Sequence, residues 1–210
     1  MTEIEIIIEG YKELFGERPV EVIPLPKSGS DRRYYRIKEL DRTAIGAYNE
    51  NPEENEAFVG FSRHFCNIRL PVPEIYGYLP DKMVYYQQDL GDDNLYTWLH
   101  RKTPISPFDD GTKILYRNIL DKLVEFQTKG ILNLDLELCY PHKSFDRQSM
   151  MWDMNYFKYM FLKLVAVPFN ERRLEHDFEL LADFLIETGQ DFFLYRDFQT
   201  ANIMVVGEKP

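Results

Sequence analysis

An Arg-Asp pair at positions 196 and 197, followed by an asparagine at 202, has the residue types and spacing that could do chemistry. In phosphoryl transfer an aspartate accepts or orients the proton of the attacking hydroxyl, and an asparagine a few residues later holds a magnesium ion that bridges the phosphates. Asp197 and Asn202 have this spacing, and Tyr195 precedes the pair. The segment therefore predicts one loop that brings both groups to the same phosphate.

Spacing alone does not identify this loop, because Asp89 and Asn94 have the same separation. Asp89 follows a predicted strand and precedes a helix-like stretch, whereas Asp197 lies between two apolar, strand-like runs after a long helical region. The second of these runs extends from Ile203 to Val206. An ordinary polar turn in a hairpin is the alternative interpretation, and the sequence context favours the catalytic one.

A turn of small residues lies between the first two predicted strands and contains Ser28, Gly29 and Ser30, with Arg32 just after it. Small residues allow backbone N–H groups to approach nucleotide phosphates, and hydroxyls and cations lie nearby. A Ser-Gly-Ser turn is more often a plain hairpin, so the prediction of a phosphate site depends on its position ahead of the loop at Asp197.

The elements that must position these residues can be predicted from periodicity and turn residues. A helix is expected from Glu3 to Phe15, and another begins at Asn51 with Phe58, Phe61 and Phe65 as its buried stripe. Strands are expected at 20–23, 33–37, 43–48, 74–79 and 83–87, and helical patterns recur at 114–126, 156–164 and 174–185.

The predicted strands and helices are segregated along the chain, which indicates an α+β fold. The chain is expected to divide near Gly91 into a strand-rich, nucleotide-binding lobe at 1–90 and a helical lobe at 91–210.

Composition limits the partners. The chain has 25 Lys and Arg against 35 Asp and Glu, a net charge of −10, which disfavours nucleic acid and anionic membrane surfaces. Its apolar runs are far shorter than the roughly 20 residues that a membrane span needs, and the first residues do not resemble a signal peptide. Cys66 and Cys139 are far apart in the sequence, and the four histidines lack metal-ligand spacing. These features predict a cytoplasmic protein.

Taken together, the turn Ser28 to Arg36, the crossing Asp89 to Gly91 and the loop Tyr195 to Asn202 resemble the aminoglycoside phosphotransferase and choline kinase family. Within it they are most similar to bacterial sugar kinases that phosphorylate N-acetylmuramate or N-acetylglucosamine at the anomeric hydroxyl. The resemblance spans roughly Val20 to Val206.

The resemblance implies a protein-kinase-like, two-lobed fold with ATP and Mg²⁺ in its cleft and a sugar or amino-sugar as small-molecule substrate. Backbone groups around Gln88, Asp89 and Leu90 would hold the adenine, Asp197 would be the catalytic base, and Asn202 a magnesium ligand. Asp146, Arg147 and Asp153 could line the substrate side.

The third predicted strand departs from the family pattern, because it has no lysine to pair with the phosphates and with a glutamate of the next helix. Arg32, Arg33 or Lys38 could supply the cation instead. The candidate glutamates, which otherwise serve only the helix dipole, are Glu53, Glu54 and Glu56.

The end of the chain departs as well. The family's next strand, with a second magnesium-binding aspartate, would follow Val206, so the resemblance implies an incomplete C-terminal lobe, with weak nucleotide binding and no turnover by these residues alone. A pseudokinase that binds nucleotide or a partner is one alternative. An aminoglycoside or choline-type kinase is the other.

Overall fold

The computed structural model describes residues 1–27, 29, 31–102, 109–189 and 191–207. Contacts divide the chain into two compact units, the first formed by Met1–Tyr140 and Tyr195–Pro210 and the second by Pro141–Leu194. Gly91 lies inside the first unit, so the predicted lobe boundary there stays a prediction.

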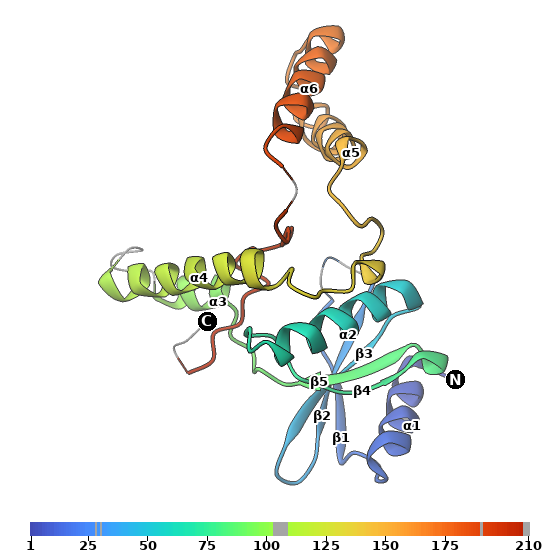
Figure 1. Ribbon diagram of the computed structural model, residues 1–210. Helices are drawn as coiled ribbons and strands as arrows, with labels where there is room; N and C mark the ends of the chain where they lie inside the picture. Colours follow the sequence, from blue (N-terminus) through green and yellow to red (C-terminus); the bar gives the residue numbers. More distant parts are fainter. Residues whose placement is uncertain (28, 30, 103–108, 190, 208–210) are drawn as a thin grey trace. The chain divides into compact units, whose positions relative to one another are not determined.

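A five-stranded antiparallel sheet forms the centre of the first unit, in the order β1-β2-β3-β5-β4 (Figure 1). The strands are β1 (Glu21–Pro24), β2 (Arg33–Lys38), β3 (Thr43–Tyr48), β4 (Ile75–Leu79) and β5 (Val84–Gln88). The sheet confirms all five predicted strands. β3 is central, with β2 and β5 as its neighbours, so residues from these three strands come together on each face.

Two helices cover the sheet, α1 (Glu3–Phe15) and α2 (Pro52–Asn67). α1 begins with a capping box at Thr2 and ends at Gly16, whose φ of 84° is the left-handed conformation that glycine favours. Asn51 caps α2 through its side chain, as its position before Pro52 predicts.

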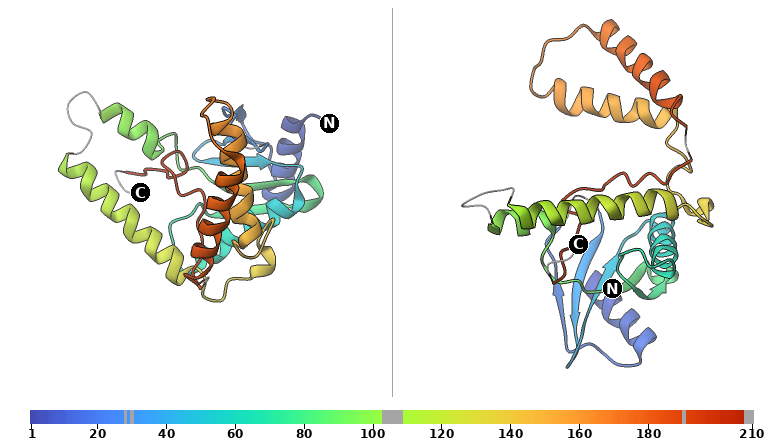
Figure 2. Two further views of the ribbon diagram at one scale, coloured as in Figure 1. Left: turned by 90° about the horizontal axis from the view of Figure 1, so that it is seen from above. Right: turned by 60° about the vertical axis from the view of Figure 1, so that its left-hand side comes forward.

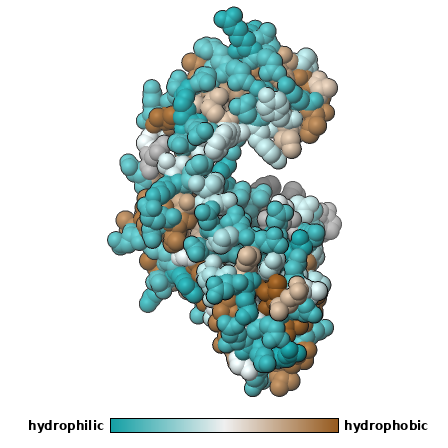
Figure 3. Space-filling model, turned by 90° about the vertical axis from the view of Figure 1, so that its right-hand side faces the viewer, coloured by the Kyte–Doolittle hydropathy of each residue, from teal (hydrophilic) through white to brown (hydrophobic). Residues whose placement is uncertain are grey.

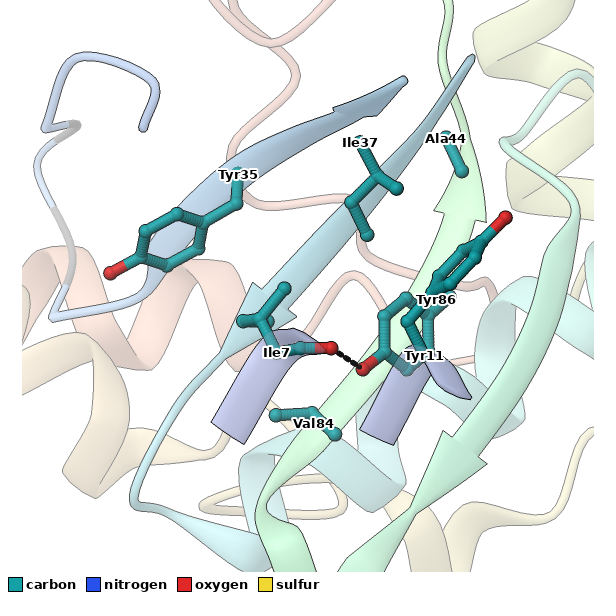
Figure 4. Close-up of a cluster of buried hydrophobic side chains, with 7 residues drawn as sticks. All are labelled: Ile7, Tyr11, Tyr35, Ile37, Ala44, Val84 and Tyr86. Atoms are coloured by element: carbon teal, nitrogen blue, oxygen red, sulfur yellow. Dashed lines mark hydrogen bonds between the residues drawn. The ribbon is translucent and has the colours of Figure 1, made fainter. Parts of the chain in front are cut away.

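Alternation along the strands assigns the two helices to opposite faces. Val84 and Tyr86 point to the α1 side, where they pack with Ile7 and Ile37 (Figure 4). Tyr85, between them in sequence, points to the α2 side, where Phe58 stacks on it with ring centroids 4.9 Å apart. Of the three phenylalanines predicted to be buried in α2, Phe65 is buried, whereas Phe58 and Phe61 are only partly buried.

Gly10 allows α1 to approach the sheet closely. A Cβ atom at this position would lie 2.6 Å from the Tyr86 hydroxyl, which donates a 2.7 Å hydrogen bond to the Ile7 carbonyl (Figure 4).

Gly10→Ala is therefore expected to destabilise the protein by about 1–3 kcal/mol through overpacking, although alanine ordinarily favours a helix. Urea denaturation measures the change. In a Tyr86→Phe background the nearest clashing atom is gone, so the cost of Gly10→Ala is expected to shrink. A gain in stability from Gly10→Ala in the wild-type background would contradict this packing.

The helical part of the first unit contains α3 (Leu95–Lys102) and α4 (Asp110–Lys129). Short helical turns also occur among the described residues, namely η1 (Pro80–Lys82) and η2 (Leu136–Leu138) in the first unit and η3 (Lys158–Leu162) in the second. Leu95, Leu115, Ile119 and Val205 form a buried cluster that joins α3, α4 and the segment near the C-terminus. This cluster provides the platform on which the loop at Asp197 rests.

The second unit contains α5 (Arg147–Phe157), η3 and α6 (Glu171–Ile186), and α5 packs against α6 (Figure 2). Lys158 is buried and forms ion pairs with Glu171 and Glu175. Apolar side chains reach the surface of the molecule as the brown patches of Figure 3, and in this unit Tyr156 and Phe161 are exposed. The aromatic side chains of the helical pattern predicted at 156–164 are therefore mostly exposed.

The predicted strand from Ile203 to Val206 is wrong as a strand of a sheet. Met204 forms only an isolated antiparallel bridge, with Asn94. The apolar character of this run has another cause, because Val205 is buried in the cluster with Leu95. In the described residues no helix is both long and apolar enough to cross a membrane.

Candidate active site

The loop from Tyr195 to Asn202 is anchored by its apolar residues and exposes its polar ones. The Tyr195 ring meets Phe126 of α4 edge-on and meets Phe198 in the same way, at 5.2 and 5.4 Å between centroids. Asp197 and Asn202 are exposed. Burial, together with the nearby charge of Asp197, raises the pKa of Tyr195, so the tyrosine stays neutral at physiological pH. Along the loop, aromatic residues that pack against the helical part thus alternate with polar residues that are exposed to solvent.

Hydrogen bonds within the loop orient the two candidate functional groups. The Asn202 side-chain Nδ2 donates to the Asp197 carbonyl oxygen at 3.0 Å, and the Gln199 backbone N–H donates to the same oxygen at 2.9 Å. Because a carbonyl oxygen only accepts, the Asn202 nitrogen must face it, which leaves Oδ1 as the atom that could bind a metal ion.

The first residues of α3, together with Asp93 just before it, hydrogen-bond to the C-terminal side of the loop. The backbone N–H of Leu95 donates to the Ile203 carbonyl at 2.7 Å, and that of Tyr96 donates to the Thr200 carbonyl at 3.1 Å. The Val205 N–H returns a bond to the Asp93 carbonyl at 2.7 Å. Residues about 100 positions earlier in the sequence therefore hold the C-terminal end of the loop.

A pocket of about 330 Å³ adjoins the loop and lies within the first unit. Its wall includes Asp197, Asn202 and Leu90, and its other lining is mainly apolar, including Phe126, Ile203 and Met204. Three residues predicted from sequence, Leu90, Asp197 and Asn202, are brought together here. The other described binding candidates, Gly29, Arg32, Gln88 and Asp89, do not line this pocket.

The second Asp and Asn pair of the same spacing has a structural role instead. The Asp89 carboxylate accepts two hydrogen bonds from the Arg36 guanidinium, at 2.8 and 3.1 Å, and a third from the Gly91 N–H. Burial alone would raise the pKa of Asp89, but these bonds lower it overall. The Asn94 side chain accepts from the Thr97 N–H and so caps α3. Asp89 and Asn94 therefore have structural partners, whereas the roles predicted for Asp197 and Asn202 stay predictions.

The three candidate cations of the turn and β2 have different partners. Arg33 pairs with Glu3 at 2.9 Å and Lys38 with Glu21 at 3.0 Å, both away from the loop residues. Arg32 pairs with Glu54 of α2 at 2.8 Å. Ser28 and Ser30 lie outside the described residues, and Gly29 is exposed.

The candidates on the substrate side lie in the second unit. Asp146 caps α5, and Arg147 forms ion pairs with Glu179 and Asp183 of α6. These contacts hold the two helices together.

Metal-binding capacity rests on oxygen donors of the loop. In the ranges that the structure describes, no three His, Cys, Asp or Glu side chains gather as a metal site. The Oδ1 of Asn202, an exposed residue that lines the same pocket as Asp197, is the kind of ligand that Mg²⁺ accepts, since this ion prefers oxygen and keeps several waters. The donor set fits Mg²⁺ shared with substrate phosphates.

Sheet, helical platform and loop together define a protein-kinase-like fold. The chain superposes on a solved ternary complex of the aminoglycoside phosphotransferase APH(2″)-IIa with streptomycin and ATP, with a TM-score of 0.61 and 12% sequence identity. The match covers 96% of this chain and 66% of that one, so the chain spans just under two thirds of its neighbour's length. No family model and no curated protein sequence matches the chain. At this identity the likeness shows the fold.

Proposed function

We propose that the protein transfers the γ-phosphoryl group of ATP, as its Mg²⁺ complex, to a hydroxyl group of a small molecule, with an amino-sugar as the first candidate. The observation that carries this proposal is that Asp197 and Asn202, joined by the hydrogen bond from Asn202 Nδ2 to the Asp197 backbone carbonyl, both line one pocket. The ATP and aminoglycoside in the structural neighbour support the same class of reaction.

Each residue then has a role in positioning or charge. Asp197 accepts the proton of the attacking hydroxyl, and Asn202 Oδ1 is a ligand for Mg²⁺, which neutralises charge on the phosphates. The main chain from Gln88 to Leu90, held by the bonds of Asp89, offers donors and acceptors to adenine. Rate enhancement in such a site comes from alignment and electrostatic stabilisation. We propose the cytoplasm as the location for two reasons. The reaction consumes ATP, and the two free cysteines are typical of a reducing compartment.

One observation favours a second candidate function. β3, Thr43–Tyr48, contains no lysine, and a kinase fold without this cation can bind nucleotide without turnover. A pseudokinase is therefore the alternative, and an aminoglycoside or choline-type acceptor is the alternative within the enzymes.

A transfer assay with labelled ATP and the full-length protein separates these candidates. The expected result is label on N-acetylglucosamine or N-acetylmuramate, as a phosphate that mild acid releases if the anomeric hydroxyl is the acceptor. Label on choline or an aminoglycoside instead would replace the acceptor, and nucleotide binding without transfer to any acceptor would favour the pseudokinase.

Asn202→Ala is expected to raise the Mg²⁺ concentration for half-maximal rate by about tenfold or more, because a direct oxygen ligand is lost. Titration of the rate with Mg²⁺ at saturating ATP measures this.

Asn94→Ala is the matched control, since Asn94 follows Asp89 at the same spacing as Asn202 follows Asp197. It should weaken the cap of α3 by about 1 kcal/mol and leave the Mg²⁺ requirement unchanged. Equal Mg²⁺ dependence in wild type and Asn202→Ala would remove Asn202 from the metal site.

A further inference from the structure

The face of the sheet covered by α2 carries a cation, Arg32, that comes from the residue just before β2 instead of from β3. In the strand register, Tyr34 of β2 lies opposite Ala47 of β3, and Ala47 lies opposite Tyr85 of β5. Side chains two residues apart in a strand share a face, so Arg32 emerges on the same side as Tyr34. Ala47, fully buried at the centre of this row, has only a methyl group as its side chain.

Two groups of α2 hold the Arg32 guanidinium. Its terminal nitrogen lies 2.8 Å from Glu54 Oε1, and its central carbon lies over the Phe58 ring, 4.9 Å from the centroid. Glu54 and Phe58 are four residues apart, so both project from one side of the helix. The Arg32 side chain is only 14% exposed. An arginine held by an ion pair and an aromatic face has a defined position and plane.

Glu54 is itself fixed by a second partner. The side-chain Nδ2 of Asn49, a buried residue just after β3, donates to Glu54 Oε2 at 3.0 Å. Glu53 and Glu56 of the same helical turn are exposed to solvent. Of the three glutamates that the sequence left open, only Glu54 joins the sheet to α2 through Arg32.

The hydrogen-bonding capacity of Arg32 exceeds what this partner uses. Guanidinium has five N–H donors, and its Nε is buried without a hydrogen-bond acceptor in the part of the chain that the structure describes. A buried donor left unpaired is costly. Phosphate oxygens are the acceptors that suit the planar fork of an arginine.

We propose that Arg32 binds the nucleotide phosphates and that Glu54 is its positioning residue, so that this pair takes the place of the strand lysine and helix glutamate found in protein kinases. This inference rests on the proposed function, because it requires a nucleotide in the cleft. It also accounts for a β3 without lysine: the cation comes from the residue just before the neighbouring strand β2, while the glutamate stays on the helix.

Affinities for ATP and for adenosine, measured by calorimetry on the full-length protein with Mg²⁺, test the pair. Arg32→Met is expected to weaken ATP binding by about ten- to a hundredfold, the range for losing charge-assisted hydrogen bonds. Adenosine, which lacks phosphates, should bind within about twofold of wild type, because the variant removes only phosphate contacts. Glu54→Gln should weaken ATP binding by a smaller factor, about three- to tenfold, and the matched control Glu53→Gln should change neither affinity.

The ratio of the two affinities identifies the role. If Arg32→Met leaves the ratio of ATP to adenosine affinity as in wild type, Arg32 has a structural role and the inference is overturned while the proposed function stands. If the wild-type protein binds adenosine and ATP equally, phosphates are not recognised and the inference is likewise overturned. A wild-type protein that binds neither ligand overturns the proposed function together with the inference. Thermal melts of each variant confirm that the comparison is made on folded protein.

Discussion

Replacing Asp197 with asparagine is expected to lower the turnover rate by about 10²–10⁴-fold, the usual loss when a general base is removed. Affinity for ATP should change by no more than about twofold, because the side chain acts on the acceptor hydroxyl in the transition state and the variant keeps its size. Asparagine cannot accept the proton, although it retains the shape of the loop. Single-turnover transfer from labelled ATP measures the chemical step directly.

The control for this experiment is Asp81→Asn, an exposed aspartate in the turn η1, Pro80–Lys82, which lies apart from the loop. Its transfer rate should equal that of wild type. An undiminished rate in Asp197→Asn would exclude Asp197 as the base. A loss in ATP affinity as large as the loss in rate would show that the variant had disturbed the loop.

The second large effect is expected on stability, from Arg36→Met. Arg36 of β2 reaches the crossing after β5, where it binds Asp89 through two hydrogen bonds and Asp92 through a third contact of 2.8 Å. The Asp89 side chain is 6% exposed. Removing the arginine leaves a buried carboxylate without its partner, which costs about 3 kcal/mol or more. Chemical denaturation at neutral pH measures the difference.

Lys38→Met provides the matched control, because Lys38 lies on the same strand and pairs with Glu21 at the surface. Its loss should change the free energy of unfolding by less than about 1 kcal/mol. If Arg36→Met and Lys38→Met lowered the free energy of unfolding by similar amounts, burial of Asp89 would not make the Arg36–Asp89 pair stronger than the surface pair Lys38–Glu21.

The same ion pair has a pH dependence with a definite sign. Arg36 and Gly91 hold the pKa of Asp89 below its ordinary value against the opposing effect of burial. A carboxyl whose pKa is lowered on folding stabilises the protein above its unfolded pKa of about 3.9, and the contribution disappears as the pH falls through the folded value. The stability difference between wild type and Arg36→Met should therefore narrow as the pH falls below about 4. A constant difference from pH 7 to pH 3 would mean that Asp89 does not titrate with this pair.

Local patterns were sufficient to predict most of the secondary structure. The capped start of α2 at Asn51, the left-handed end of α1 at Gly16 and the five strands follow from side-chain periodicity and turn residues, which act over a few residues. The spacing of Asp197 and Asn202 is local in the same sense, since the bond that joins them closes a short loop. The candidate role of this pair could therefore be predicted from the sequence by itself, and it stays a prediction.

The roles of side chains whose contact partners are distant in the sequence became clear only from the tertiary structure. Asp89 could be assigned a structural role only because Arg36, 53 residues earlier, reaches it across the sheet. Arg32, Arg33 and Lys38 are equivalent in sequence, and only the placement of α2 on the sheet brings Arg32 to Glu54. The run from Ile203 to Val206 looked like a strand because burial, not pairing, selects its apolar residues. Periodicity reports that a side chain is buried or exposed, whereas the identity of its partner is set by which elements pack together.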